Sequence, residues 1–540
     1  MDHGDFRKQK YVHELRVAVA LLALLGRGAT AEADTVVAIT APSVGATVSG
    51  SVTVTTAVGS AVSWTDLYID GNYWTSGPPF SNSWNSKTFT NGSHTISASA
   101  FGTNGAVIGS ASVSVKVSNS SPTPTPTPSP TPSDPAYYVD SVHGSDSNNG
   151  RSPSSAWQTM SKVKQFISEN VLVPGDQILF ARGDSWTGGL TLPTGINGSS
   201  SNPIVFGNYG SGALPIIDGG SSAAACFYAR GTGSGRTPLW SYITINGFEC
   251  RNTTAYGVLF YQNQGGSAGM PGIVVKNMNI HNTGPGAYAG GGGGYDDDNY
   301  RNQLMFLDEN HLADGVRFLN NKVDTCGGHN CIQVQFDTGS PQIIGNTCYG
   351  WVHNCIDVKQ SRGVLVKNNV VHGPNPQGAA YYYENLVGPV TNGSITWQGN
   401  LAYNVPNGIE CEGDSSLGRV SCRAYNNTLY LGNSSAIVSA ATGGLSWDVR
   451  NNILDTTDPI YVCDSYNTNS CGEIKTWDYN DDGGSQGNPD SAVAGPHDII
   501  GVNPVYVSET RANLHLQSGS PCINAGLPGL TSGNADMGAY

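Results

Sequence analysis

Three short segments of the chain place carboxylates beside a lysine and tyrosines. They read CIDVK at 355–359, AYYYEN at 380–385 and GIECE at 408–412. If each segment is a β-strand, every second side chain points to the same face. Asp357 then shares a face with Lys359 on the first strand, and Glu410 shares that face with Glu412 on the third. Carboxylates and a lysine gathered on one face could act as general acids, general bases or nucleophiles.

The middle segment has two registers, and its sequence leaves both open. Tyr381 and Tyr383 face outward in one register, whereas Tyr382 and Glu384 face outward in the other. Either register adds groups that can donate or accept a proton.

The polar face extends one strand upstream and ends one strand downstream. CIQVQ at 331–335 turns Gln333 and Gln335 outward, whereas the later positions Val438 and Ala440 are not polar. His329 also recurs as His353, each followed by an asparagine at the start of such a strand. The residues expected to bind substrate are therefore Gln333, Gln335, His329, His353, Arg362 and Tyr381.

A solvated surface is the competing interpretation of this face. Under this interpretation, Asp357 and Lys359 form an exposed ion pair that contributes little to folding stability. Against it, stacked carboxylates repel one another unless a cation or a function compensates.

The strands that must position these residues belong to a repeat. Short apolar strands separated by Asn-Asn or Gly-Asn steps return every 23 to 31 residues, and aligning them gives one recurring position: Asn321, Asn346, Asn369, Asn400, Asn427 and Asn452. A period of this length is typical of a solenoid, whose units bury their apolar faces by stacking. The repeat therefore predicts a parallel β-helix, with a helix over 157–170 covering its N-terminal end.

Three further segments carry a resemblance to a known superfamily. They read YYVDSVHGSDSNNG at 137–150, PGDQILFARGDSWT at 174–187 and PCINAGLPGLTSGNADMGAY at 521–540. Together with the asparagine repeats, they resemble bacterial right-handed β-helix proteins of the pectate-lyase-like superfamily. The resemblance implies an all-β fold, a right-handed parallel β-helix solenoid over 136–540. That superfamily holds lyases, hydrolases, isomerases and non-enzymes, so the reaction must be argued from the site.

The N-terminal quarter of the chain predicts export and a second module. Residues 1–33 have basic residues, a short apolar run and an A-x-A site, as a signal peptide does. Residues 34–118 alternate like strands and resemble bacterial immunoglobulin-like β-sandwiches, and 119–135 form a Pro/Thr-rich linker. We expect a secreted bacterial protein, extracellular or periplasmic.

The composition of the chain limits the kinds of molecule that the protein is expected to bind. The net charge of −14 argues against nucleic-acid binding, which requires a basic surface. No segment is long and apolar enough to predict a membrane span, and we expect a monomer acting on a polysaccharide. Eleven cysteines leave at least one unpaired within the chain. Cys463 and Cys471 could close a small loop, whereas Cys331 and Cys355 could stack as buried apolar residues.

We favour β-elimination on a uronic-acid polysaccharide as the reaction. Lys359 is then the base and Tyr383 protonates the leaving oxygen. A Ca²⁺ ion held by Glu410, Glu412 and Asp357 would neutralise the substrate carboxylate. The segment IDVKQSRGVLVKNNVV at 356–371 resembles the lysine-bearing coil of the alginate lyase and chondroitinase B family, whose lysine falls on Lys359. The arginine that this family has one coil later is absent.

Two other functions stay open. Glycoside hydrolysis would use Asp357 with Glu384 on the next coil, or with Glu410 two coils away. A non-catalytic solenoid would bind glycans through the same face. A glycine-rich insertion, Gly290–Arg301, could line one side of a substrate groove along this face, bind a cation or serve neither role.

Overall fold

The computed structural model contains two compact units, divided near residue 124. The described residues are 36–119 and 136–539, with gaps of one to three residues and longer gaps at 103–106, 233–236, 264–267, 285–301, 374–377, 464–470, 483–493 and 528–535. The predicted signal peptide, most of the predicted linker and the Gly290–Arg301 insertion lie outside the described residues.

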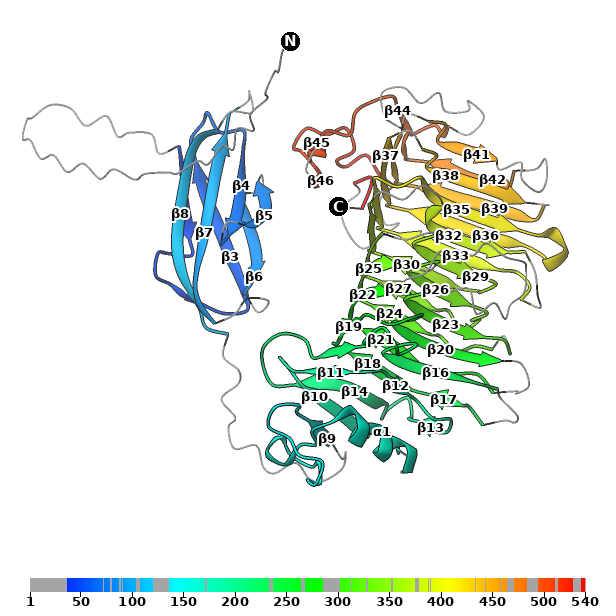
Figure 1. Cartoon of the computed structure of the whole chain (residues 1–540). Coiled ribbons are helices and arrows are strands. Elements are labelled where there is room, and N and C mark those ends of the chain that lie inside the picture. Colours follow the sequence, from blue (N-terminus) through cyan, green and yellow to red (C-terminus); the bar gives the residue numbers. More distant parts are fainter. Residues whose placement is uncertain are drawn as a thin grey trace, which may run out of the picture. The chain divides into compact units, whose positions relative to one another are not determined.

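The N-terminal unit is a β-sandwich (Figure 1). One sheet has the order β1 (Val37–Ala41), β3 (Ser51–Val58), β6 (Ser81–Asn85). The other has the order β2 (Thr47–Val48), β8 (Val107–Val117), β7 (Gly92–Phe101), β4 (Trp64–Ile69), β5 (Asn72–Gly77). Alternate residues of these strands, among them Val54, Leu67 and Ile96, are fully buried between the sheets, as is Trp84.

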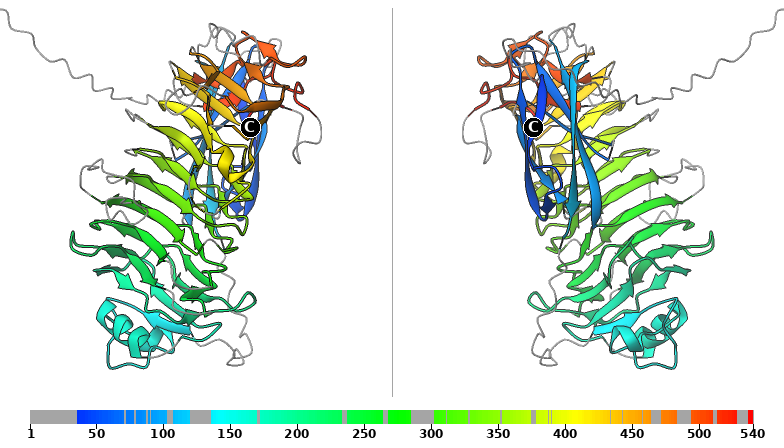
Figure 2. Two further views of the ribbon diagram at one scale, coloured as in Figure 1. Left: turned by 90° about the vertical axis from the view of Figure 1, so that its right-hand side faces the viewer. Right: turned by 90° about the vertical axis from the view of Figure 1, so that its left-hand side faces the viewer.

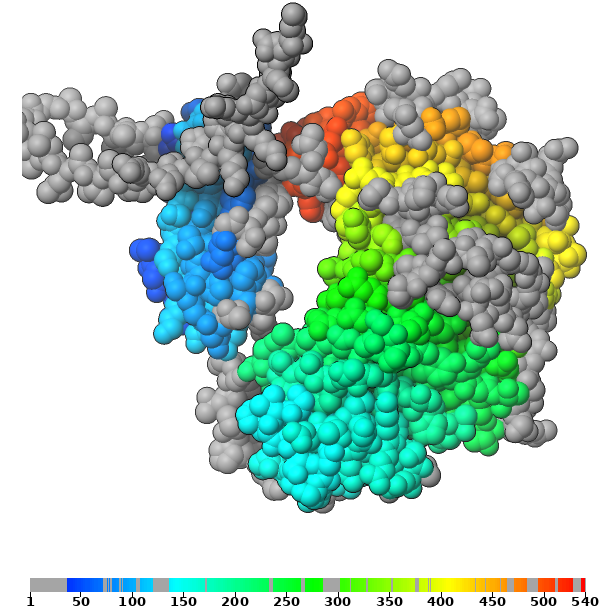
Figure 3. Space-filling model, in the orientation of Figure 1, coloured from blue at the N-terminus to red at the C-terminus, as the bar shows by residue number. Residues whose placement is uncertain are grey.

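The second unit is a solenoid whose chain passes through three long parallel sheets in turn, coil after coil (Figure 2). Its coils succeed one another from cyan through green and yellow to orange in the space-filling view (Figure 3). The first sheet contains β9 (Ala136–Val139), β10 (Gln177–Ala181), β14 (Ile204–Tyr209), β18 (Ile243–Asn246), β21 (Val274–Lys276), β24 (Arg317–Leu319), β27 (Gln342–Ile344), β30 (Val364–Lys367), β33 (Ser394–Gln398), β36 (Val420–Tyr425), β39 (Leu445–Arg450) and β42 (Glu473–Asp478).

The second sheet follows a sharp turn from the first. It contains β11 (Ser185–Thr187), β15 (Ile216–Asp218), β19 (Glu249–Arg251), β22 (Asn279–Thr283), β25 (Lys322–Cys326), β28 (Thr347–Tyr349), β31 (Val370–His372), β34 (Leu401–Tyr403), β37 (Thr428–Gly432), β40 (Ile453–Thr456), β43 (Asp481–Asp482) and β44 (Ile499–Ile500).

The third sheet contains the segments on which the sequence places the candidate site. It consists of β12 (Leu190–Thr191), β16 (Phe227–Thr232), β20 (Val258–Asn263), β23 (Leu304–Asp308), β26 (Ile332–Gln335), β29 (Ile356–Lys359), β32 (Ala379–Asn385), β35 (Asn407–Gly413), β38 (Ile437–Ala441) and β41 (Tyr461–Cys463).

Smaller elements complete the solenoid. The pairs β13 (Ile196–Asn197) with β17 (Trp240–Ser241), and β45 (Tyr506–Ser508) with β46 (Asn513–Leu516), form two small sheets. Two 3₁₀ turns span Pro153–Ser155 and Ser415–Leu417. The predicted helix is α1 (Met160–Glu169); its buried Met160, Val163 and Ile167 are spaced at helical intervals and pack on the solenoid core.

The predicted asparagine position is confirmed as a buried ladder at the turn between the first and second sheets. From Asn346 onward, the Oδ1 of each ladder asparagine accepts the backbone N–H and the amide of the asparagine one coil earlier, as Asn400 does for Asn369. The ladder runs from Asn321 to Asn480. The residue before each ladder position turns the chain with a positive φ, for example +53° at Asn368 and +64° at Gly399, which explains the Asn-Asn and Gly-Asn steps.

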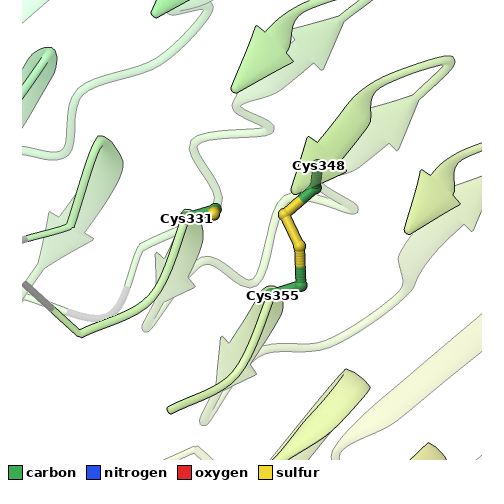
Figure 4. Close-up of side chains that lie close together, drawn as sticks. All are labelled: Cys331, Cys348 and Cys355. Atoms are coloured by element: carbon green, nitrogen blue, oxygen red, sulfur yellow. A yellow bond between two sulfur atoms is a disulfide. The ribbon is translucent and has the colours of Figure 1, made fainter. Parts of the chain in front are cut away.

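Five disulfides link ten of the eleven cysteines: Cys226–Cys250, Cys326–Cys331, Cys348–Cys355, Cys411–Cys422 and Cys463–Cys471. Cys522 is free and buried. The prediction for Cys463 and Cys471 is confirmed, and the one for Cys331 and Cys355 is wrong. Cys355 meets Cys348 across the turn from the second to the third sheet, with Cys331 beside them (Figure 4). Among the described residues, no helix is long and apolar enough to cross a membrane.

Candidate active site

The outer face of the third sheet brings the predicted polar residues into two rows that run across the coils. The parallel register between β26, β29, β32 and β35 defines both rows. One row is Gln333, Asp357, Tyr382 and Glu410, and the other is Gln335, Lys359, Glu384 and Glu412. Apolar residues continue the rows on both sides, with Met305 and Leu307 before them and Val438 and Ala440 after them. The polar site therefore spans four coils, as the sequence predicts on the downstream side.

The structure decides between the two registers of β32. Tyr382 aligns with Asp357, and Glu384 aligns with Lys359, so these two side chains lie on the outer face. The predictions for Tyr381 and Tyr383 are wrong, because both side chains are fully buried in the solenoid core. Their hydroxyls are occupied there: Tyr381 donates to the carbonyls of Asn369 and Leu401, and Tyr383 donates to that of Ser361.

Lys359 links two carboxylates on the outer face. Its Nζ lies 3.3 Å from Oε1 of Glu384 and 3.9 Å from Oδ2 of Asp357, and its side chain is only 15% exposed. Opposite charges at this separation favour the charged forms of both partners. The lysine therefore serves as a cation between the two carboxylates in this arrangement.

Glu384 is held as a carboxylate. Burial acts to raise its pKa, but the charge of Lys359 and hydrogen bonds from Gln360 and Tyr382 together bring the pKa below the ordinary value. Gln360 donates to Oε1 at 3.0 Å and the Tyr382 hydroxyl donates to Oε2 at 2.9 Å. Both oxygens are thus fixed in orientation.

Glu412 has the opposite character. It aligns with Glu384 on the next coil. Burial, reinforced by the negative charge of Glu384, raises the pKa of Glu412 to about 7, against hydrogen bonds with Tyr382 and Glu410. Near neutral pH this carboxyl can therefore both give and take a proton.

Asp357 is completely buried beneath the site. Burial raises its pKa to about 6, whereas Lys359 and two amide donors oppose that rise. Asn330 and Asn354 donate to its Oδ2 at 2.8 and 3.2 Å. Because its side chain is 0% exposed, Asp357 is placed to anchor Lys359 rather than to contact a ligand.

His329 and His353 stack at the start of these strands, with ring centroids 4.4 Å apart. Burial lowers the pKa of His329 to about 2 and that of His353 to about 4, so both imidazoles are neutral at pH 7. Together with Asp357 they offer ligand atoms within 4.8 Å of one another. However, the amide of Asn354, whose oxygen accepts from the backbone of Ala379, donates to Nδ1 of His353. His353 then carries its proton on Nε2, which suits a hydrogen-bond donor better than a metal ligand.

The remaining predicted residues separate into two groups. Gln333 and Gln335 are 2% and 7% exposed, and their amides bond to neighbouring side chains rather than facing solvent. Arg362 lies exposed in the turn after β29, and no described side-chain contact joins it to the site. Sequence reasoning missed Gln360, a buried residue after β29 whose amide reaches Glu384, because no repeat marks that position.

The predicted calcium ligands do not converge. Tyr382 lies between Asp357 and Glu410 in one row, so these carboxylates are two coils apart, roughly 10 Å. Glu410 and Glu412 lie on one strand and remain a predicted pair of oxygen ligands. Among the described residues, the cysteine group that could hold a metal consists of disulfide partners.

Comparisons with known proteins agree with the two units. Residues 36–98 match the family model of the bacterial Ig domain. A lacto-N-biosidase of Bifidobacterium longum subsp. longum is 30% identical over 134 residues, which is 22% of this chain and 8% of that protein. The chain thus matches only a small part of that relative's length.

Two solved structures are similar over much of the chain. Pectate lyase Pel9A is 16% identical over 75% of this chain and 96% of that chain, with a TM-score of 0.45. An α-1,3-glucanase from Streptomyces thermodiastaticus is 12% identical over 85% of this chain and 90% of that chain, with a TM-score of 0.39. The N-terminal unit therefore matches a bacterial Ig domain, and the larger unit is a parallel β-helix built from three sheets.

Proposed function

We propose that this protein is a glycan-degrading enzyme, and specifically a retaining glycoside hydrolase. Glu384 is its nucleophile and Glu412 its acid–base catalyst. One observation carries the proposal: the two carboxyls lie side by side on adjacent coils, and their surroundings shift their pKa values in opposite directions. Such a pair of environments separates the two roles that a glycosidase needs.

The spacing supports retention rather than inversion. Strands on adjacent coils are ~4.8 Å apart. Side chains aligned in register keep about that separation, which is close to the ~5–5.5 Å of retaining enzymes. We therefore propose Glu384 with Glu412 in place of the pair predicted from the sequence, Asp357 with Glu384. Asp357 is buried and is bound by Lys359 and two amides.

The mechanism follows from these placements. A carboxylate oxygen of Glu384 attacks the anomeric carbon while Glu412 gives its proton to the departing glycosidic oxygen, leaving a glycosyl ester on Glu384. Glu412, now ionised, takes a proton from water as that water attacks the same carbon, and Glu384 leaves as a carboxylate. Tyr382 donates to Oε2 of Glu384 and Lys359 pairs with Oε1, so both neighbours orient the nucleophile.

The charge of the site favours a neutral substrate. Four carboxyl groups and one lysine occupy the two rows, and the whole chain carries a net charge of −14. A polyuronate would be repelled by this surface unless cations screened it. The local similarity to a lacto-N-biosidase supports a search among neutral oligosaccharides. The five disulfides and the predicted signal peptide support action outside the cell.

Elimination by Lys359 is supported less well. A base must release its proton before the reaction, whereas Lys359 lies between two carboxylates that favour the ammonium form. Its predicted acid partner, Tyr383, is in the core. The elimination mechanism therefore stays a prediction that the following experiment addresses.

The test is a substrate screen with the full exported chain. p-Nitrophenyl glycosides, beginning with the lacto-N-bioside, and neutral and uronic-acid polysaccharides are each incubated with the enzyme. Released nitrophenol, reducing ends and the ultraviolet absorbance of unsaturated uronates are followed together. We expect nitrophenol or reducing ends without ultraviolet absorbance, and loss of activity in Glu384→Ala. Ultraviolet absorbance that depends on Lys359 would overturn the hydrolase in favour of the lyase.

A further inference from the structure

A chain of amide hydrogen bonds crosses the coils and ends on Glu384. Asn302 donates to Gln333, and Gln333 Nε2 donates to Oε1 of Gln335 at 3.0 Å. Gln335 Nε2 donates to Oε1 of Gln360 at 3.2 Å, and Gln360 Nε2 donates to Oε1 of Glu384 at 3.0 Å. These four hydrogen bonds all run in the same direction, which we call the amide chain.

The amide chain is sealed from solvent. Asn302 and Gln360 are 0% exposed, and Gln333 and Gln335 are nearly so. Buried amides are costly unless they are hydrogen-bonded, and a polar network that is kept in such a place commonly specifies one arrangement. The two glutamines that the sequence assigns to substrate binding therefore act inside the protein.

The direction of the amide chain is fixed at both ends. An ionised Glu384 can only accept, so Gln360 must donate to it, and the oxygen of Gln360 must then accept from Gln335. At the other end, Oδ1 of Asn302 accepts the backbone N–H of Asn330, which leaves its amide to donate to Gln333. Aligned amides polarise one another, which strengthens the last hydrogen bond, the one to the carboxylate.

The backbone of Gln360 makes a second contact with Glu384. Its φ is +41°, a conformation that few residues other than glycine adopt. In that conformation its N–H donates to the carbonyl oxygen of Glu384 at 2.7 Å while its side chain binds the carboxylate of the same residue.

We propose that Gln360, aligned by the amide chain from Asn302, is a positioning residue that aims Glu384 and keeps it charged for attack. This inference rests on the proposed role of Glu384 and adds residues from three earlier coils to the catalytic machinery. The other charged and titratable groups that face Glu384 are Lys359, Asp357, Tyr382, His353 and Glu412.

The experiment compares pH profiles of kcat/KM for the full chain on the p-nitrophenyl glycoside that the screen identifies. Gln360→Met removes the donor to Glu384 but keeps a side chain of similar length. Gln335→Met keeps the Gln360 amide that donates to Glu384 but removes the Gln335 amide that aligns Gln360. Gln342→Met, in β27 on another face of the solenoid, is the matched control.

We expect the acid limb of the profile, which reports ionisation of the nucleophile, to move upward by about one pH unit in Gln360→Met. That is the tenfold change expected when a carboxylate loses one hydrogen bond. Gln335→Met should move the limb in the same direction by less, and Gln342→Met should leave it in place.

An unmoved acid limb in either chain variant, with thermal stability like that of the control, would overturn the inference. If Gln360→Met does not fold, Gln335→Met alone decides. Glu384→Ala distinguishes failure of the proposed hydrolase function from failure of the positioning role of Gln360. An active Glu384→Ala would refute the proposed function itself, whereas an inactive one with unmoved limbs would refute only the positioning role.

Discussion

Replacing Glu412 by glutamine is the sharpest test of the acid–base assignment. Glutamine has the shape of the carboxyl group but cannot give or take a proton at the glycosidic oxygen. The structure puts the pKa of Glu412 at about 7, raised by burial and by Glu384. Activity of the wild-type enzyme should therefore fall as the pH rises through 7, because the acid must be protonated when the bond breaks.

The size of both effects follows from that value. One pH unit above its pKa, about one carboxyl in ten is still protonated, so kcat/KM at pH 8 should be roughly a tenth of its plateau. In Glu412→Gln this alkaline limb should disappear. On natural glycans, whose leaving groups need a proton, the variant should lose ~10²–10⁴-fold in kcat.

The assay compares leaving groups across pH 4 to 9. A dinitrophenyl glycoside departs without protonation, so Glu412→Gln should form the glycosyl ester from it at nearly the wild-type rate and then hydrolyse that ester slowly. A burst of dinitrophenol is the expected signal, and added azide should speed turnover by replacing water. An alkaline limb that survives in Glu412→Gln would refute the assignment of this residue as the acid.

Folding stability should depend on the same carboxyl with a definite sign. Its pKa is higher in the folded protein than the ordinary value of 4.5. A raised value means that the folded state binds the proton more tightly, so this contribution is fully present below about pH 4.5 and is lost as the pH rises through about 7. Urea unfolding of wild type and Glu412→Gln at pH 5 and pH 8 measures the difference, and equal slopes against pH would contradict it.

Three further outcomes are expected. Tyr381→Phe should lower the free energy of unfolding in urea by about 1–3 kcal/mol, because two core carbonyls lose a hydrogen-bond donor. Tyr382→Phe should instead lower kcat with little change in stability. The reverse pattern would contradict the register of β32, in which Tyr381 is buried and Tyr382 lies on the outer face. Lys359→Met should shift the acid limb upward and cut kcat/KM at pH 5 at least about tenfold, since Glu384 loses its cation, and an unchanged profile would exclude that pairing. EDTA should leave hydrolysis unchanged, and a loss of rate that Ca²⁺ restores would favour the predicted calcium site and the lyase instead.

The fold could be predicted because the same backbone and hydrogen-bond requirements recur in every coil. A ladder asparagine such as Asn369 must sit where its amide meets those of neighbouring coils, and the residue before it must accept a positive φ. Both requirements restrict residue types at one position of every coil, so the period is visible in the sequence. The helix α1 was predictable for a similar reason, since its apolar spacing reports the face that it buries.

The side that β32 turns outward could not be predicted. Three consecutive tyrosines give no alternation of polar and apolar residues, and a tyrosine can lie in the core when its hydroxyl finds carbonyls, as that of Tyr381 does. Glutamines at outward positions likewise predict contact with solvent, yet Gln333 and Gln335 find amide partners and are buried. The partners come from separate coils, and no local pattern records them.

The sequence by itself determined the parallel β-helix, the sheet on which the carboxylates gather and the coils that carry them, because residue types at fixed intervals reflect backbone requirements that recur in each coil. Only the tertiary structure decided which carboxyl is ionised and which is protonated near neutral pH. That difference depends on burial and on Lys359, Gln360 and Tyr382 at distances of 2.9 to 3.3 Å from Glu384, and stacking of the coils creates these contacts.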